Sequence, residues 1–101
     1  MNLRKALATT IRSARKRKHL TQEDFAIVSS RTYLSALERG LKSPTLDKLD
    51  EIAQTMGIHP AVLVLAAYEV KTAHDETQVS LEAIIAEAKQ LVTYMQSLNE
   101  G

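Results

Sequence analysis

Cysteine is absent from this 101-residue chain, and no apolar run is long enough to cross a membrane. The lack of cysteine excludes disulfides, thiol nucleophiles and thiolate metal sites, and it fits a reducing compartment. The longest uninterrupted apolar run, Ala61 to Tyr68, is far shorter than the roughly 18 residues that a spanning helix requires. We therefore expect a cytoplasmic protein with no membrane partner.

Glycine and proline are also scarce, with three and two residues, while apolar side chains recur every three or four positions. This pattern predicts an all-α protein and leaves no segment typical of a strand. The expected helices cover residues 3–18, 22–28, 31–39, 46–56, a segment starting at Pro60, and 81–98. We expect residues 1–72 to form one domain, residues 73–80 a loop (with 74–78 the polar part), and residues 81–98 an appended amphipathic helix.

The formal net charge is only +1, but the two halves of the chain differ. Residues 1–45 contain ten basic and three acidic side chains, a net charge of +7, whereas residues 46–101 contain three and nine, a net charge of −6. Such a division is typical of a protein with one surface for a polyanion, although balancing between solvated faces would give the same count.

Catalytic and metal-binding constellations are not evident in the sequence. His19, His59 and His74 are scattered, with no cluster of carboxylates beside them, so we expect no metal site. Serines at 29, 30 and 35 lack the histidine and aspartate partners that activate a nucleophile. We expect no enzyme activity, no cofactor and no small-molecule ligand.

The segment 31–39 has two unlike faces when drawn as a helix. Leu34 and Leu37 point together toward a core, while Thr32, Ser35 and Arg39 centre the opposite face, flanked by Arg31 and Ala36. Two short helices with a serine-containing turn between them are the ingredients of a helix-turn-helix. The exposed face suits a DNA major groove, and it would equally suit a solvated surface.

The order of the surrounding motifs decides between these readings. The blocks Leu20-Thr21-Gln22-Glu23-Asp24-Phe25-Ala26, Ser30-Arg31-Thr32-Tyr33-Leu34-Ser35-Ala36-Leu37-Glu38-Arg39-Gly40, Ser43-Pro44-Thr45-Leu46 and Ile52-Ala53-Gln54-Thr55-Met56-Gly57-Ile58 closely resemble the lambda-repressor-like, Xre-type DNA-binding domain. The resemblance covers residues 3 to 70. It implies a five-helix domain that binds double-stranded DNA.

The resemblance also assigns roles to individual positions. It implies that base edges are read by Arg31, Thr32, Ser35 and Ala36. It implies that the sugar-phosphate backbone is contacted by Gln22, Tyr33, Arg39, Lys42, Ser43 and Thr45. It pairs Arg15 with Glu38 in a structural ion pair, and the helical wheel agrees because Glu38 lies at the edge of the core-facing side.

The chain departs from the family pattern at the turn before Ser30. Only Ile27, Val28 and Ser29 separate Ala26 from Ser30, which is shorter than is usual in the family, and the usual turn glycine is missing. Either the turn is tighter or the helix before it ends earlier.

The last predicted helix has apolar residues spaced alternately by three and four, as in a helix–helix seam. This stripe consists of Leu81, Ile84, Ala88, Leu91, Met95 and Leu98. It could fold onto the helix that starts at Pro60, or it could meet a second chain. We predict a homodimer through the last helix, the Pro60 helix or both, and a repressor that binds a palindromic operator. The alternative is a helical protein–protein module, such as an antitoxin or regulator-binding partner.

Overall fold

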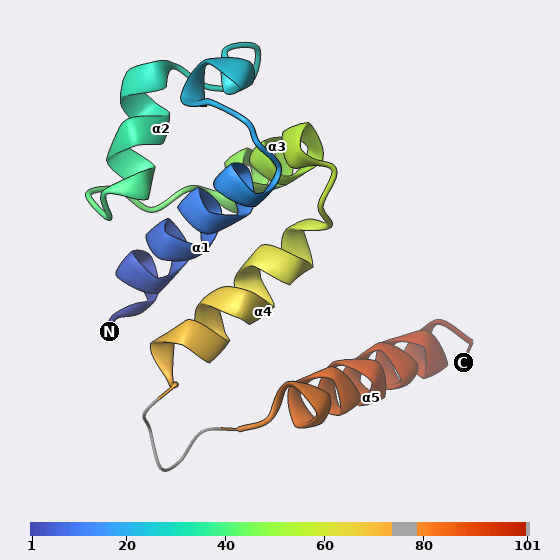
Figure 1. Cartoon of the computed structure of the whole chain (residues 1–101). Coiled ribbons are helices and arrows are strands. Elements are labelled where there is room, and N and C mark those ends of the chain that lie inside the picture. The colour runs from blue at the N-terminus through green and yellow to red at the C-terminus, as the bar shows by residue number, and fades with distance from the viewer. Residues whose placement is uncertain (74–78, 101) are drawn as a thin grey trace.

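The computed structural model describes residues 1–73 and 79–100, and every regular element in these ranges is helical (Figure 1). The elements are α1 (Leu3–Arg17), the 3₁₀ helix η1 (Gln22–Phe25), α2 (Arg31–Glu38), α3 (Leu46–Met56), α4 (Pro60–Lys71) and α5 (Leu81–Glu100). The all-α prediction is confirmed. The polar loop expected at residues 74–78 lies outside the described residues.

Side-chain oxygens cap the N-termini of three helices, which start at the residues expected from the sequence. Ser30 Oγ before α2, Thr45 Oγ1 before α3 and Ser80 Oγ before α5 each accept a backbone N–H bond of 3.1 Å from three residues further on. These bonds satisfy amides of the first turn, which have no partner inside the helix. Pro60 occupies the first turn of α4, where its missing N–H costs nothing.

Left-handed residues follow the ends of α1 and α2, and one caps the end of α3. His19, Gly40 and Gly57 have φ values of 59°, 73° and 68°. The positive φ favours glycine at Gly40, and a Cβ there would lie in van der Waals contact with α1, 3.4 Å from Lys5 Cγ and 3.8 Å from Ala8 Cβ. The end of α2 therefore packs closely on α1.

The helix predicted over residues 22–28 is wrong in type and length. The structure has one 3₁₀ turn, η1, followed by a turn over residues 26–28. Ala26 N–H bonds to Glu23 O and Val28 N–H to Phe25 O, each three residues back and each 3.0 Å long. Only three residues separate Ala26 from Ser30, and a 3₁₀ turn rises about 2.0 Å per residue against about 1.5 Å in an α-helix, so fewer residues cover the distance to Ser30.

The core lies between α1, η1, α2, α3 and α4. Its buried side chains are Ile11, Phe25, Leu34, Leu37, Leu49, Ile52, Ala53, Met56 and Leu63. α4 runs back alongside α1, and these two helices form the most extensive packing in the described chain (Figure 1). This bundle holds α2 by its apolar face.

α5 stands apart from the bundle (Figure 1). Leu91, Met95 and Leu98 on its apolar stripe are 58%, 53% and 62% exposed. Ile84, nearer the start of the helix, is half-buried. An apolar groove of about 690 Å³ lies between α4 and α5, lined among others by Leu65, Ile84 and Val92. The stripe predicted from the sequence is therefore present and largely uncovered within this chain.

Candidate nucleic-acid interface

α2 is anchored on one side and polar on the other. Leu34 and Leu37 are 0% and 1% exposed in the core. Arg31 and Thr32, in the first turn, are exposed, and Ser35 one turn later is half-buried. The helix thus presents a short polar, cationic face, and its position is set by the packing behind it.

Ala36 departs from the expected arrangement. We expected it on the flank of the exposed face, but it is only 6% exposed. The chain folds back at the end of α2, where the Leu41 N–H donates to the Ala36 carbonyl at 3.0 Å. A buried methyl group is not available to a thymine methyl, so Ala36 does not fit the base-reading role that the resemblance implied, and Arg31, Thr32 and Ser35 remain the expected base readers.

Arg15 and Glu38 form the ion pair that the resemblance implied. Arg15 Nε donates to Glu38 Oε2 at 2.7 Å and Nη2 donates to Oε1 at 2.8 Å, while Nη1 donates to the Leu20 carbonyl at 2.8 Å. The side chains are 11% and 3% exposed. Hydrogen bonding to Glu38 raises the pKa of Arg15 above its ordinary value, against the opposing effect of burial, so the guanidinium stays charged. The bidentate pair locks the end of α2 to α1.

Gln22 joins this pair from the start of η1. Its Nε2 donates to Glu38 Oε1 at 3.2 Å, and the residue is half-buried. The amide is therefore oriented by the same carboxylate that anchors α2. A phosphate at this position would meet a side chain already held in place, with the first turn of η1 beside it.

Tyr33 and the loop after α2 carry most of the other expected backbone contacts. The Lys42 Nζ lies 5.5 Å from the centre of the Tyr33 ring, within range of a cation–π contact. Arg39 and Ser43 are exposed, and Arg39 Nε donates to the Ser35 carbonyl at 3.3 Å. Thr45 is exposed but its Oγ1 already caps α3. These residues cluster around the end of α2 and the start of α3.

Arg31 is itself paired in the free protein. Its Nη1 lies 3.3 Å from Glu23 Oε1 on η1, and both side chains are 73% exposed. A pair this exposed contributes little to stability and can be exchanged for another partner. Arg31 is therefore available to a base or a phosphate.

Lys48 is the residue near this face that the sequence did not single out. From the first turn of α3 its Nζ donates to the Val28 carbonyl at 2.5 Å and to Glu51 Oε2 at 2.9 Å, and it lies 6.0 Å from the centre of the Tyr33 ring. No local pattern marks a lysine as the partner of a carbonyl 20 residues away. Only the fold brings the two together.

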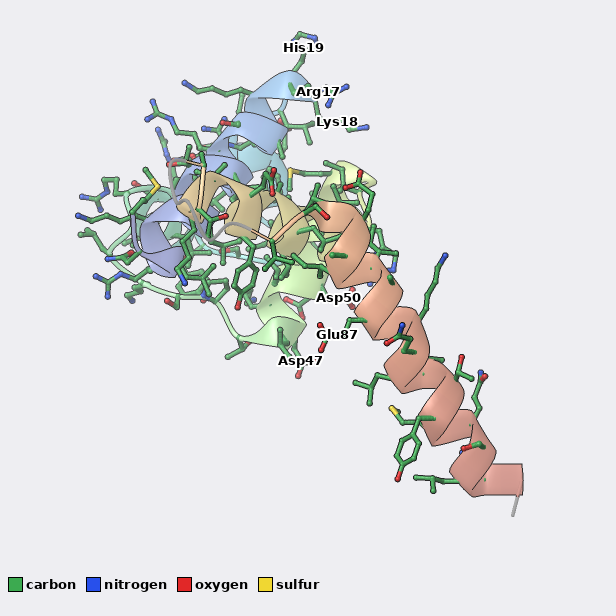
Figure 2. All side chains as sticks on the ribbon, turned by 90° about the horizontal axis from the view of Figure 1, so that it is seen from below. Arg17, Lys18, His19, Asp47, Asp50 and Glu87 are labelled. Atoms are coloured by element: carbon green, nitrogen blue, oxygen red, sulfur yellow. The ribbon has the colours of Figure 1, made fainter. Side chains whose placement is uncertain are left out.

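Basic side chains at the end of α1 lie away from several acidic side chains of α3 and α5. Figure 2 shows Arg17, Lys18 and His19 around the C-terminal end of α1, well separated from Asp47 and Asp50 on α3 and from Glu87 on α5.

Within residues 1–73 and 79–100 there is no group of three or more histidine or acidic side chains placed to hold a metal ion. None of the described helices is long and apolar enough to cross a membrane.

A helix held by its apolar face, with a polar face outward and a short helical turn before it, defines a helix-turn-helix DNA-binding domain. The helix-turn-helix family matches this chain over residues 11–63. The chain is 41% identical, over 66 residues, to an uncharacterized HTH-type transcriptional regulator, y4dJ, of Sinorhizobium fredii. The aligned region covers 63% of this chain and 86% of that relative. No solved structure matches.

The chain belongs to the lambda-repressor-like, Xre-type helix-turn-helix family. The matched range, residues 11–63, contains η1, α2 and α3, which carry the face described above. Membership makes the protein a DNA-binding regulator, and it confirms the resemblance seen in the sequence.

Proposed function

We propose that the protein is a sequence-specific repressor that inserts α2 into the major groove of its operator. The observation that carries this proposal is the exposed first turn of α2, with Arg31 and Thr32 projecting from a helix whose other face is fixed in the core. Arginine can donate two hydrogen bonds to a guanine, and serine and threonine hydroxyls can serve any base. Arg31, Thr32 and Ser35 are the proposed base readers.

The proposed backbone contacts surround these base readers. Lys42, Arg39 and Ser43 are exposed beyond the end of α2, Tyr33 lies beside Lys42, and Gln22 and Thr45 lie at the starts of η1 and α3. Contacts of this kind fix the register of a protein on the duplex without reading its sequence. They also make affinity depend on salt concentration.

We propose that the working form is a homodimer in which α5 pairs with α5 of a second copy. The uncovered stripe on α5 supports this, since Leu91, Met95 and Leu98 are all more than half exposed in the single chain. A helix of 20 residues is about 30 Å long, enough for several turns of seam. Two copies related by a two-fold axis would read two half-sites about 34 Å apart, which predicts a palindromic operator.

Selection of bound fragments from a pool of random duplexes, at about 150 mM salt, tests this proposal. We expect an enriched inverted repeat with half-site centres about 10 base pairs apart. Enrichment of a single half-site would contradict the dimer, and no enrichment at all would contradict sequence-specific binding. A reporter promoter overlapping the selected site should be silenced, and activation would contradict the repressor role.

A further inference from the structure

The turn before α2 is stabilised by two hydrogen bonds to a single carbonyl. The N–H groups of Val28 and Ser29 both donate to the Phe25 carbonyl, at 3.0 and 2.8 Å, and the Phe25 side chain is fully buried. The turn is therefore fixed to the core at its start. Ser30, two residues after Val28, caps α2, so the path of the turn determines the orientation of α2.

The end of the turn is fixed by a different element. Lys48 Nζ, on the first turn of α3, donates to the Val28 carbonyl at 2.5 Å. The lysine side chain is only 29% exposed, and Glu51 on the same helix accepts from the same Nζ at 2.9 Å. A charged donor gives a stronger hydrogen bond to a carbonyl than a neutral one does. The shortened turn thus has one anchor in the core and one in α3.

We infer that Lys48 is a positioning residue for DNA recognition, which sets the tilt of α2 by holding the Val28 carbonyl. This inference rests on the proposed role of α2 as the base-reading helix. A turn without the usual glycine cannot rely on a left-handed residue to bring the chain into α2, and the bond from Lys48 supplies the missing constraint. Arg31 begins α2 three residues after Val28, so a shift of the turn moves it directly.

Lys48 and Lys42 differ in a way that separates positioning from phosphate binding. Both ammonium groups lie near the Tyr33 ring, at 6.0 and 5.5 Å. Lys48 already has a carbonyl and a carboxylate as partners, whereas Lys42 is exposed and forms no salt bridge within the described chain. A phosphate that binds Lys48 would have to displace its carbonyl and carboxylate partners, whereas a phosphate that binds Lys42 would not have to displace a salt-bridge partner.

The test compares a double variant, which carries both Lys48→Met and Glu51→Gln, with the single variant Lys42→Met. The double variant keeps the net charge unchanged and removes the bond to Val28 together with the Lys48–Glu51 ion pair and the ammonium group near the Tyr33 ring. We expect its preference for the selected operator over random duplex to fall about tenfold, which corresponds to the misplacement of one good base contact. Its affinity for random DNA and the slope of log affinity against log salt should stay as in the wild type. Lys42→Met should weaken both DNAs alike and reduce that slope by about one.

Amide hydrogen exchange gives a readout that does not need DNA. In the double variant the N–H groups of Tyr33 and Leu34, which bond to Ser30, should exchange faster, while the amide of Ile52 in the core should be unchanged. Lys48→Arg, which keeps a charged donor, should restore both slow exchange and operator preference. Unchanged exchange at Tyr33, or equal loss on both DNAs with a reduced salt slope, would overturn the inference. If the wild-type chain prefers no sequence, the proposed function fails, and exchange alone still decides the role of Lys48.

Discussion

The Glu38 carboxylate links three parts of the DNA-binding face. It accepts two bonds from Arg15 on α1 and one from Gln22 on η1, and it is carried by the last residue of α2. With the side chain 3% exposed, water cannot replace these donors. Such a carboxylate stabilises the fold only while its partners are present.

Substituting Arg15 by methionine should therefore be costly, because it leaves the buried charge unpaired. We expect the free energy of unfolding to fall by up to about 3–5 kcal/mol, measured by urea denaturation. The double variant Arg15→Met with Glu38→Leu should recover much of this loss, since no charge is then buried. A cost below about 1 kcal/mol for the single variant would show that the pair behaves as an exposed one.

Two residues show what the sequence could not reveal about the site. Ala36 was expected at the edge of the exposed face, yet its side chain is buried in the folded chain. Lys48 was one basic residue among many, until the fold placed it against Val28. The burial of Ala36 and the placement of Lys48 depend on how separate segments pack together, which a helical wheel of one segment does not describe.

Capping determines where the elements begin, and it could be predicted well. The expected ranges 31–39 and 46–56 and the expected start at Pro60 match the starts of α2, α3 and α4, where Ser30 and Thr45 act as caps and Pro60 occupies the first turn. The preference for such residues at helix starts is local chemistry. The type of η1 was not predicted, because the choice between a 3₁₀ turn and an α-helix depends on the distance that the chain must cover to reach Ser30.

Ser30→Ala tests the importance of the cap on α2. We expect a loss of about 1 kcal/mol in the free energy of unfolding, because the Tyr33 N–H loses its acceptor, and thermal denaturation would measure it. Ser13→Ala is the matched control: Ser13 is exposed inside α1, where alanine favours the helix, so no loss is expected. Equal effects of the two substitutions would contradict the capping role.

The whole molecule combines a cationic DNA-binding half with an acidic half that ends in α5. The net charge of +1 is the sum of +7 over residues 1–45 and −6 over residues 46–101. From the near-neutral total we expect weak non-specific attraction of the entire molecule to DNA, which would leave more of the discrimination to the proposed contacts from α2. The uncovered stripe of α5 is the surface through which we propose that two copies associate.

Leu91→Glu tests the dimer. A carboxylate in the proposed seam would be buried without a partner, so sedimentation should show a folded monomer at concentrations where the wild type is a dimer. Gln90→Glu adds the same charge one residue away, off the proposed seam, and should leave the dimer intact. An unchanged dimer for Leu91→Glu would exclude α5 as the seam.

The proposal that α2 reads base sequence can be tested by measuring the binding of Arg31→Ala to the selected operator and to random duplex. We expect the difference in binding free energy between the two DNAs to fall by about 1–3 kcal/mol for Arg31→Ala, whereas Lys42→Ala should weaken binding to both equally. Equal losses on both DNAs for Arg31→Ala would show that Arg31 contacts phosphate only, and base reading by this residue would be wrong.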